Sequence, residues 1–116
     1  MEFTTSLKKN YEFRRLYQRG KSMAAPNLVV YFRRNGGREN RLGITVSNKI
    51  GNAVVRNRVR RRMREIYRQN EARLARGIDL VVVARAKSAA ADYSGLEKDF
   101  CRACASLGLF REEAEK

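Results

Sequence analysis

The residues best suited to chemistry lie together near the middle of the chain, in Lys49–Arg68. Eight basic residues and the single acid Glu65 give this stretch a charge of +7, half of the chain's formal +14. Like charges four residues apart each destabilise a helix by about 0.2–0.5 kcal/mol, so the run indicates a polyanionic partner. The basic residues are Lys49, Arg56, Arg58, Arg60, Arg61, Arg62, Arg64 and Arg68.

Arginine is the side chain expected where phosphate is bound, because its planar fork donates two hydrogen bonds at once and stacks on bases. Asn57 lies on the arginine side of the predicted helix, which favours RNA contact. Asn52 is placed first to cap the helix and second to contact RNA. Ser47, Asn48 and Lys49 form a loop between a strand and a helix, where backbone N–H groups often meet phosphate.

Other interpretations of this basic helix fit less well. A merely solvated face usually mixes Glu with Lys. A DNA-reading basic zipper needs a leucine heptad after the basic stretch, and Gly77 leaves no room for one. A membrane-surface helix needs a bulky apolar face, whereas this one is mostly valine with one tyrosine.

Residues that could run catalysis or hold a metal are sparse. The chain has no histidine, which removes the commonest general base. Cys101 and Cys104 lie within a predicted helix without the further ligands of a zinc site, so we expect Cys104 in the core and Cys101 partly exposed. Asp79, Asp92 and Asp99 are too scattered to predict a metal cluster. We therefore predict no catalytic residue and no metal site on the polypeptide.

The bulk composition predicts one small RNA-binding domain, residues 1–116, with a frayed tail at 112–116. A hydrophobic share of 43% is too high for a disordered chain. The longest apolar stretch, Leu80–Ala84, has the length of a strand, and Met1–Lys21 has no apolar run of signal-peptide length. We expect a cytoplasmic protein with no membrane contact.

The periodicity predicts the order α-β-β-α-β-α, with helices packed on one small central sheet, an α+β or α/β sandwich. We expect Asn10 and a Ser94-x-x-Glu97 capping box to begin the outer helices, Gly20 to end the first helix, and a hairpin through Asn35-Gly36-Gly37. The pattern also allows an additional strand pairing near Ser22–Ala25. The predicted elements are Asn10–Arg19, Asn27–Arg33, Arg41–Ser47, Asn52–Arg73, Ile78–Arg85 and Ser94–Leu107.

The stretch SNKIGNAVVRNRVRRRMREIYR, Ser47–Arg68, closely resembles the signature of the bacterial ribonuclease P protein component. Its core is Arg56-Asn57-Arg58, and the strands GITVS and DLVVVAR also match. The resemblance extends along the whole chain. One mild departure is Tyr17, at a position where the family commonly has phenylalanine.

The resemblance implies an auxiliary, non-catalytic subunit of an RNA-based endonuclease that removes the 5′ leader of precursor tRNA. It implies a left-handed β-α-β crossover around the basic helix. The RNA subunit would carry the active site and the Mg²⁺ ions, and the protein would dock through the region Arg56–Arg64. The residues expected to bind the RNA subunit are Lys49, Asn52, Arg56, Asn57, Arg58, Arg60, Arg61, Arg62 and Arg64.

The leader is expected in a cleft between the first helix and the sheet, because single strands are held by basic grooves with aromatic platforms. Spacing alone places Phe13, Leu16 and Tyr17 in an ordinary core stripe, whereas the resemblance makes Phe13, Tyr17 and Tyr31 part core and part cleft. The residues expected to bind the leader are Phe13, Tyr17, Tyr31, Ser47, Asn48, Lys8, Lys9 and Arg14.

Two rival functions stay open at this point. A structural ribosomal RNA-binding protein shares the basic charge and the small α/β size. A protein nuclease would need the histidine or the clustered acids that the chain lacks.

Overall fold

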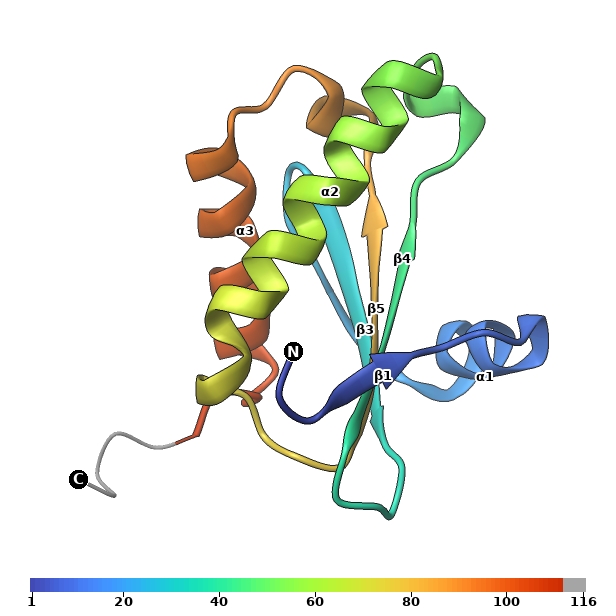
Figure 1. Cartoon of the computed structure of the whole chain (residues 1–116), viewed down its shortest axis with the longest axis vertical. Helices are drawn as coiled ribbons and strands as arrows, with labels where there is room; N and C mark the ends of the chain where they lie inside the picture. Colours follow the sequence, from blue (N-terminus) through green and yellow to red (C-terminus); the bar gives the residue numbers. More distant parts are fainter. Residues whose placement is uncertain (112–116) are drawn as a thin grey trace.

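The computed structural model describes residues 1–111, a five-stranded sheet with helices on both faces (Figure 1). The predicted frayed tail, 112–116, lies outside the described residues. The strands follow the order β1-β4-β5-β3-β2 across the sheet. They are β1 (Thr4–Ser6), β2 (Lys21–Ala24), β3 (Leu28–Arg34), β4 (Asn40–Thr45) and β5 (Ile78–Ala84). The helices are α1 (Asn10–Arg19), α2 (Ala53–Asn70) and α3 (Tyr93–Ser106), with short 3-10 turns η1 (Asn48–Ile50), η2 (Glu71–Arg73) and η3 (Ala86–Ala89).

The fold class and the six predicted elements are confirmed, but the predicted hairpin is wrong. β3 and β4 do not pair, because β5 lies between them, antiparallel to β3 and parallel to β4. Six of the seven β5 residues are buried, and a strand apolar on both faces is most stable at the centre of a sheet. The segment around Gly36 does turn, and Gly36 has a φ of +77°. It connects β3 to β4 across the N-terminal end of β5, which lies between these two strands.

The two faces of the sheet are covered unequally. α2 and α3 pack together against one face, and the short α1 covers part of the other (Figure 1). The α2–α3 side holds the main core, which includes Leu80, Tyr67 and Phe100. The α1 side holds a small cluster of Leu7, Leu16 and Val81, so much of this face is free to line a binding surface.

Two helix starts differ from prediction. Asn10 is the first residue of α1 and Lys9 precedes it as the cap. Asp92, and not Ser94, caps α3, because its carboxylate accepts a hydrogen bond from the Gly95 N–H at 2.8 Å. Both observed caps are local contacts between residues three apart, so the error lies in the choice between neighbouring candidate residues.

The predicted cap at Asn52 is confirmed, since its side-chain oxygen accepts a hydrogen bond from the Val55 N–H at 3.0 Å. Gly20 ends α1 as predicted, but its backbone is extended, with φ −77° and ψ 166°, and is not left-handed. A Cβ there would lie 2.6 Å from the Leu16 carbonyl oxygen and 2.8 Å from that of Phe32. Close backbone approach, and not a left-handed cap, therefore requires this glycine.

The sheet edges are short strands. β2 matches the additional strand expected near Ser22–Ala25, whereas β1 was not predicted. β4, α2 and β5 form a β-α-β unit with parallel neighbouring strands, and its left-handed sense stays a prediction of the resemblance. No helix within residues 1–111 combines the length and apolar content that crossing a bilayer requires.

Candidate nucleic-acid interface

The arginines of α2 fall into groups with different surroundings. Arg58 and Arg62 lie on the side toward η3, where each donates a hydrogen bond to a backbone carbonyl. The Arg58 guanidinium lies 3.0 Å from the Ala89 oxygen, and that of Arg62 lies 3.1 Å from the Ala91 oxygen. These two arginines therefore fasten the β5–α3 connection to α2 in addition to any contact with RNA.

The outer face of α2 presents Asn57, Arg61 and Arg64 to solvent, with Arg60 half-buried beside them. The Arg60 guanidinium donates to the Asn57 side-chain oxygen at 3.1 Å, which holds both side chains on the outside of the helix. None of these arginines is ion-paired with an acid of residues 1–111. Their charge is available to an anionic partner.

The single acid of the basic stretch is already paired. Glu65 accepts a hydrogen bond from the Arg68 guanidinium at 2.9 Å and another from Gln69 at 3.0 Å. The bond from Arg68, with the lesser contribution of Gln69, lowers the pKa of Glu65 to about 2. This pair lies at the C-terminal half of α2, so the N-terminal half keeps its positive charge.

The loop before α2 extends the basic surface. Ser47, Asn48 and Lys49 are exposed, and the Ser47 hydroxyl accepts a hydrogen bond from the Lys49 N–H at 3.3 Å. Arg56 donates to the Gly51 carbonyl at 2.8 Å, which ties the first turn of α2 to the loop. The loop is therefore joined to the first turn of α2, and the side chain of Asn52 is engaged in capping that helix.

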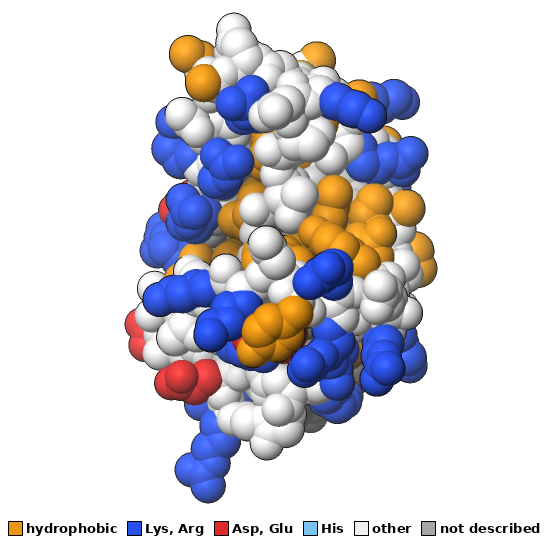
Figure 2. Space-filling view, turned by 90° about the vertical axis from the view of Figure 1, so that its right-hand side faces the viewer, with side chains coloured by type: hydrophobic (Ala, Val, Ile, Leu, Met, Phe, Trp, Pro, Cys, Tyr) orange, Lys and Arg blue, Asp and Glu red, His pale blue; other side chains and the backbone are white. Residues whose placement is uncertain are grey.

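A second surface lies beside α1. Asn10, Phe13, Arg14, Tyr17 and Thr45 line an open hollow of about 480 Å³. Figure 2 shows hydrophobic side chains gathered on this face, with Lys and Arg side chains above and below them. An apolar floor with a basic border is the arrangement that holds single-stranded nucleic acid.

Two of the predicted aromatics, Phe13 and Tyr17, line this hollow, and the third, Tyr31, contacts Tyr17. The rings of Tyr17 and Tyr31 make an edge-to-face contact with centroids 5.0 Å apart. Tyr17 is 39% exposed, whereas Leu16 beside it is fully buried, so the predicted core stripe divides between core and surface. Phe13 and Tyr31 are half-buried: each packs against the small core cluster and keeps part of its ring at the surface.

The basic residues around α1 are exposed and lie at different places. Arg14 lines the hollow, and Lys8 and Lys9 immediately precede α1. Arg15 packs over the ring of Tyr11 at 5.6 Å, on the outer side of the helix. Of this set, Arg14 is the residue that lines the hollow together with Phe13 and Tyr17.

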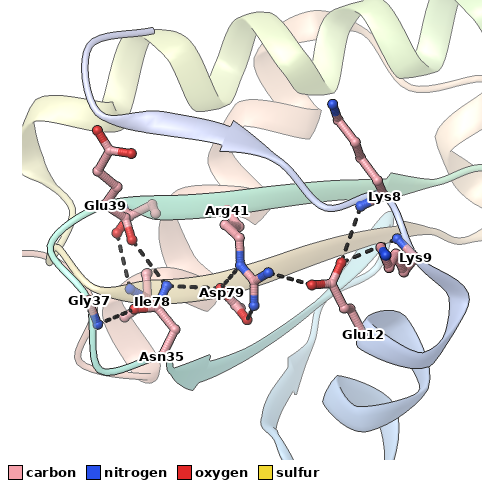
Figure 3. Close-up of polar contacts among 10 residues, drawn as sticks. Lys8, Lys9, Glu12, Asn35, Gly37, Glu39, Arg41, Ile78 and Asp79 are labelled. Atoms are coloured by element: carbon pink, nitrogen blue, oxygen red, sulfur yellow. Dashed lines mark hydrogen bonds and ion pairs between the residues drawn. The ribbon is translucent and has the colours of Figure 1, made fainter.

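A partly buried ion network that was not predicted holds α1 on the sheet (Figure 3). Arg41 donates to both carboxylate oxygens of Asp79, at 2.9 and 2.7 Å, and forms an ion pair with Glu12. The hydrogen bond with Asp79 is the main cause of a raised Arg41 pKa. The signal in the sequence was Asp79 itself, an acid within the apolar run of β5.

The described part of the chain contains no group of three or more His, Cys, Asp or Glu side chains able to hold a metal ion. Its buried acids are already bonded to protein donors: Asp79 to Arg41, Glu71 to backbone N–H groups, and Asp99 to Asn27. Cys104 is buried and Cys101 half-buried, as predicted, and burial raises both thiol pKa values.

Comparisons with known proteins show the family to which the chain belongs. A family model described as Ribonuclease P matches residues 1–108. The ribonuclease P protein component of Natranaerobius thermophilus is 40% identical over 102 residues, 88% of this chain and 89% of the relative. That of Caldanaerobacter subterraneus is 42% identical over 112 residues, 97% of each chain. The RNase P protein structure from Staphylococcus aureus matches with a TM-score of 0.84 at 32% identity, covering 91% of this chain and 97% of the other. The chain therefore belongs to the ribonuclease P protein family.

Proposed function

We propose that this chain is the protein subunit of a ribonuclease P ribonucleoprotein, which removes the 5′ leader from precursor tRNA. The observation that carries the proposal is the presence of two distinct surfaces for polyanions. One is the outer face of α2, whose arginines lack acid partners within residues 1–111, and the other is the aromatic hollow beside α1.

The first surface would bind the RNA subunit. Its centre is Asn57, Arg60, Arg61 and Arg64, exposed or half-buried on one side of α2. Arginine forks bind phosphate bidentately, and the row of them matches a run of phosphates along an RNA strand. Lys49, Asn52, Arg56, Arg58 and Arg62 would complete this surface, and the side chains of the last four are held by hydrogen bonds within the protein.

The second surface would bind the leader. Phe13 and Tyr17 supply partly exposed rings in the hollow, Tyr31 adds a half-buried ring in contact with Tyr17, and Arg14 supplies charge at the hollow. Stacking is tolerant of sequence, because every base has a flat face, and one protein can then serve many precursor tRNAs. Lys8, Lys9, Ser47 and Asn48 would contact backbone phosphates at the ends of this path.

In this proposal the polypeptide performs no bond cleavage. Mg²⁺ ions held mainly by the RNA subunit would activate water and stabilise the leaving oxygen. The side chains of this chain bind, orient and neutralise phosphates, which raises affinity for both the catalytic RNA and the precursor. We infer that the whole chain, 1–116, acts as one RNA-binding domain in the cytoplasm.

The test is reconstitution. The protein is mixed with ribonuclease P RNA at low magnesium, and cleavage of precursor tRNA is measured; we expect 5′ maturation to be restored. If cleavage is not restored, the proposal is wrong. Cleavage by the protein with no RNA subunit present would instead make the polypeptide a nuclease.

A further inference from the structure

α1 carries four of the five residues that line the hollow, and three contacts with the strand β4 hold this helix in place. Side chains two residues apart on β4 point to the same face of the sheet, about 7 Å apart. Arg41, Gly43 and Thr45 are such a row. On α1, Glu12 forms an ion pair with Arg41. Phe13 packs against Gly43, and Tyr17 is hydrogen-bonded to Thr45.

Each contact is close. The ring of Phe13 lies so near Gly43 that a Cβ on this glycine would be 2.5 Å from the ring. The hydroxyls of Tyr17 and Thr45 are hydrogen-bonded at 2.9 Å. The remaining contact is the ion pair between Arg41 and Glu12. Of the three contacts, it is the one in which neither residue lines the hollow.

Arg41 is itself rigidly held. Asp79, only 5% exposed, binds it through two oxygens and also accepts from the Asn35 side chain at 2.9 Å (Figure 3). Glu12 continues the network to α1, where its carboxylate accepts from the Lys9 N–H at 3.2 Å. The first turn of α1 is thereby fixed to the centre of the sheet.

The network is unsuited to binding phosphate directly. Arg41 gives its Nε, Nη1 and Nη2 groups to carboxylates, so its hydrogen-bonding fork is occupied. One guanidinium and two carboxylates together carry a charge of −1, which repels an RNA strand. Any effect of these residues on RNA binding must therefore act through the placement of α1.

We propose that Arg41 and Glu12 are positioning residues for leader binding, because their ion pair fixes the height and angle of α1 and so sets the width of the hollow. This inference rests on the proposed function. It predicts that removing either charge weakens binding of the leader although neither side chain touches RNA.

The two partners allow a test in which charge and position give opposite expectations. Glu12→Gln raises the net charge by one, and a purely electrostatic effect would tighten RNA binding. Arg41→Gln lowers the charge by one and would loosen it. Positioning predicts that both variants weaken the leader's contribution to binding by about tenfold, as expected for the loss of about one stacked base.

The measurement is made on the holoenzyme, as the ratio of dissociation constants for mature tRNA and for precursor tRNA with a leader. Glu39→Gln and Arg102→Gln are the matched controls; both residues are exposed, and in the described structure neither side chain is hydrogen-bonded or ion-paired. We expect a lowered ratio for both network variants, unchanged salt dependence, partial recovery in Arg41→Lys, and a wild-type ratio for both controls.

Affinity for the RNA subunit separates positioning from loss of fold, because an unfolded protein loses both activities. The inference is overturned if Glu12→Gln tightens leader binding, as the change in charge alone would. It is also overturned if both variants lose affinity for the RNA subunit by as large a factor as they lose the leader's contribution to binding. If instead the wild-type protein shows no preference for precursor over mature tRNA, the proposed function itself fails. A normal wild-type preference that both variants retain rejects only the positioning role.

Discussion

Arginines that look equivalent along α2 differ in what they touch. Arg62 donates to the Ala91 carbonyl and is half-buried, whereas Arg61 and Arg64 are exposed. Helical spacing places Arg58 and Arg62 on one border of the apolar stripe and Arg60 and Arg64 on the other. One border faces η3 and the other lies toward β1, since Arg64 lines a small hollow with residues of that strand.

These surroundings predict different outcomes for two alanine variants. Arg60→Ala should reduce the salt dependence of RNA-subunit binding by about one phosphate contact and leave stability within about 0.5 kcal/mol. Arg62→Ala should lower the free energy of unfolding by about 1 kcal/mol, because the Ala91 carbonyl loses its donor. Urea unfolding and binding at several salt concentrations measure the two effects. Equal loss of salt dependence in both variants would contradict this division.

Tyr31 offers the clearest test of the hollow. Tyr31→Ala should weaken binding of precursor tRNA by about 1–3 kcal/mol, the range for one stacked base, and leave binding of mature tRNA unchanged. Tyr31→Phe is the control, because it keeps the ring and its edge-to-face contact with Tyr17. Equal losses for precursor and mature tRNA would assign Tyr31 to the core alone.

At the scale of elements, the edge strand β1 depends on one buried acid. Glu71, 3% exposed, accepts hydrogen bonds from the Glu2 N–H at 2.8 Å, the Phe3 N–H at 3.1 Å and the Thr4 hydroxyl. Burial raises the pKa of Glu71, but these hydrogen bonds outweigh it and the pKa is lowered from 4.5. β1 also pairs in parallel with β4, so the Glu71 carboxylate helps to hold this edge strand on the sheet.

A lowered pKa in the folded state means that Glu71 stabilises the protein above pH 4.5 and that this contribution is lost as the pH falls further. Glu71→Gln should lower the free energy of unfolding at neutral pH by about 1–3 kcal/mol. The difference between variant and wild type should narrow at acid pH, as measured by urea unfolding. A difference that does not change with pH would show that shape, and not charge, matters at this position.

At the scale of the whole molecule, the charge of +14 acts in opposite directions on folding and on binding. Self-repulsion destabilises the compact state, and attraction to phosphate supports RNA binding. Both are screened by salt, with a Debye length near 10 Å at about 0.1 M.

Raising sodium chloride from about 50 mM to about 300 mM should therefore increase the melting temperature by a few degrees while it weakens RNA binding. Thermal unfolding and RNA titration over the same salt series measure the two trends. A melting temperature that falls with salt would mean that ion pairs such as Arg41–Asp79 outweigh the general repulsion.

Much of this protein follows from the sequence alone. The period of the apolar residues predicts α2 and α3, and the β-branched run in Ile78–Arg85 predicts β5. The arginine density of Lys49–Arg68 predicts the polyanionic partner. These features depend on neighbours within one or two turns, so local patterns contain them. The long motif around Arg56-Asn57-Arg58 identifies the family for the same reason, since it is contiguous.

The tertiary structure decided what depends on distant partners. It placed β5 between β3 and β4, added β1 through Glu71, and joined Glu12, Arg41 and Asp79 across separations of 29 and 38 residues. It also divided the arginines of α2 between protein carbonyls and solvent. Pairing of strands and burial of charges are settled by which segments meet in space, and no local pattern encodes that meeting. The interface is thus basic and aromatic by sequence, whereas the hollow that brings these side chains together arises only from the packing of α1 on β4.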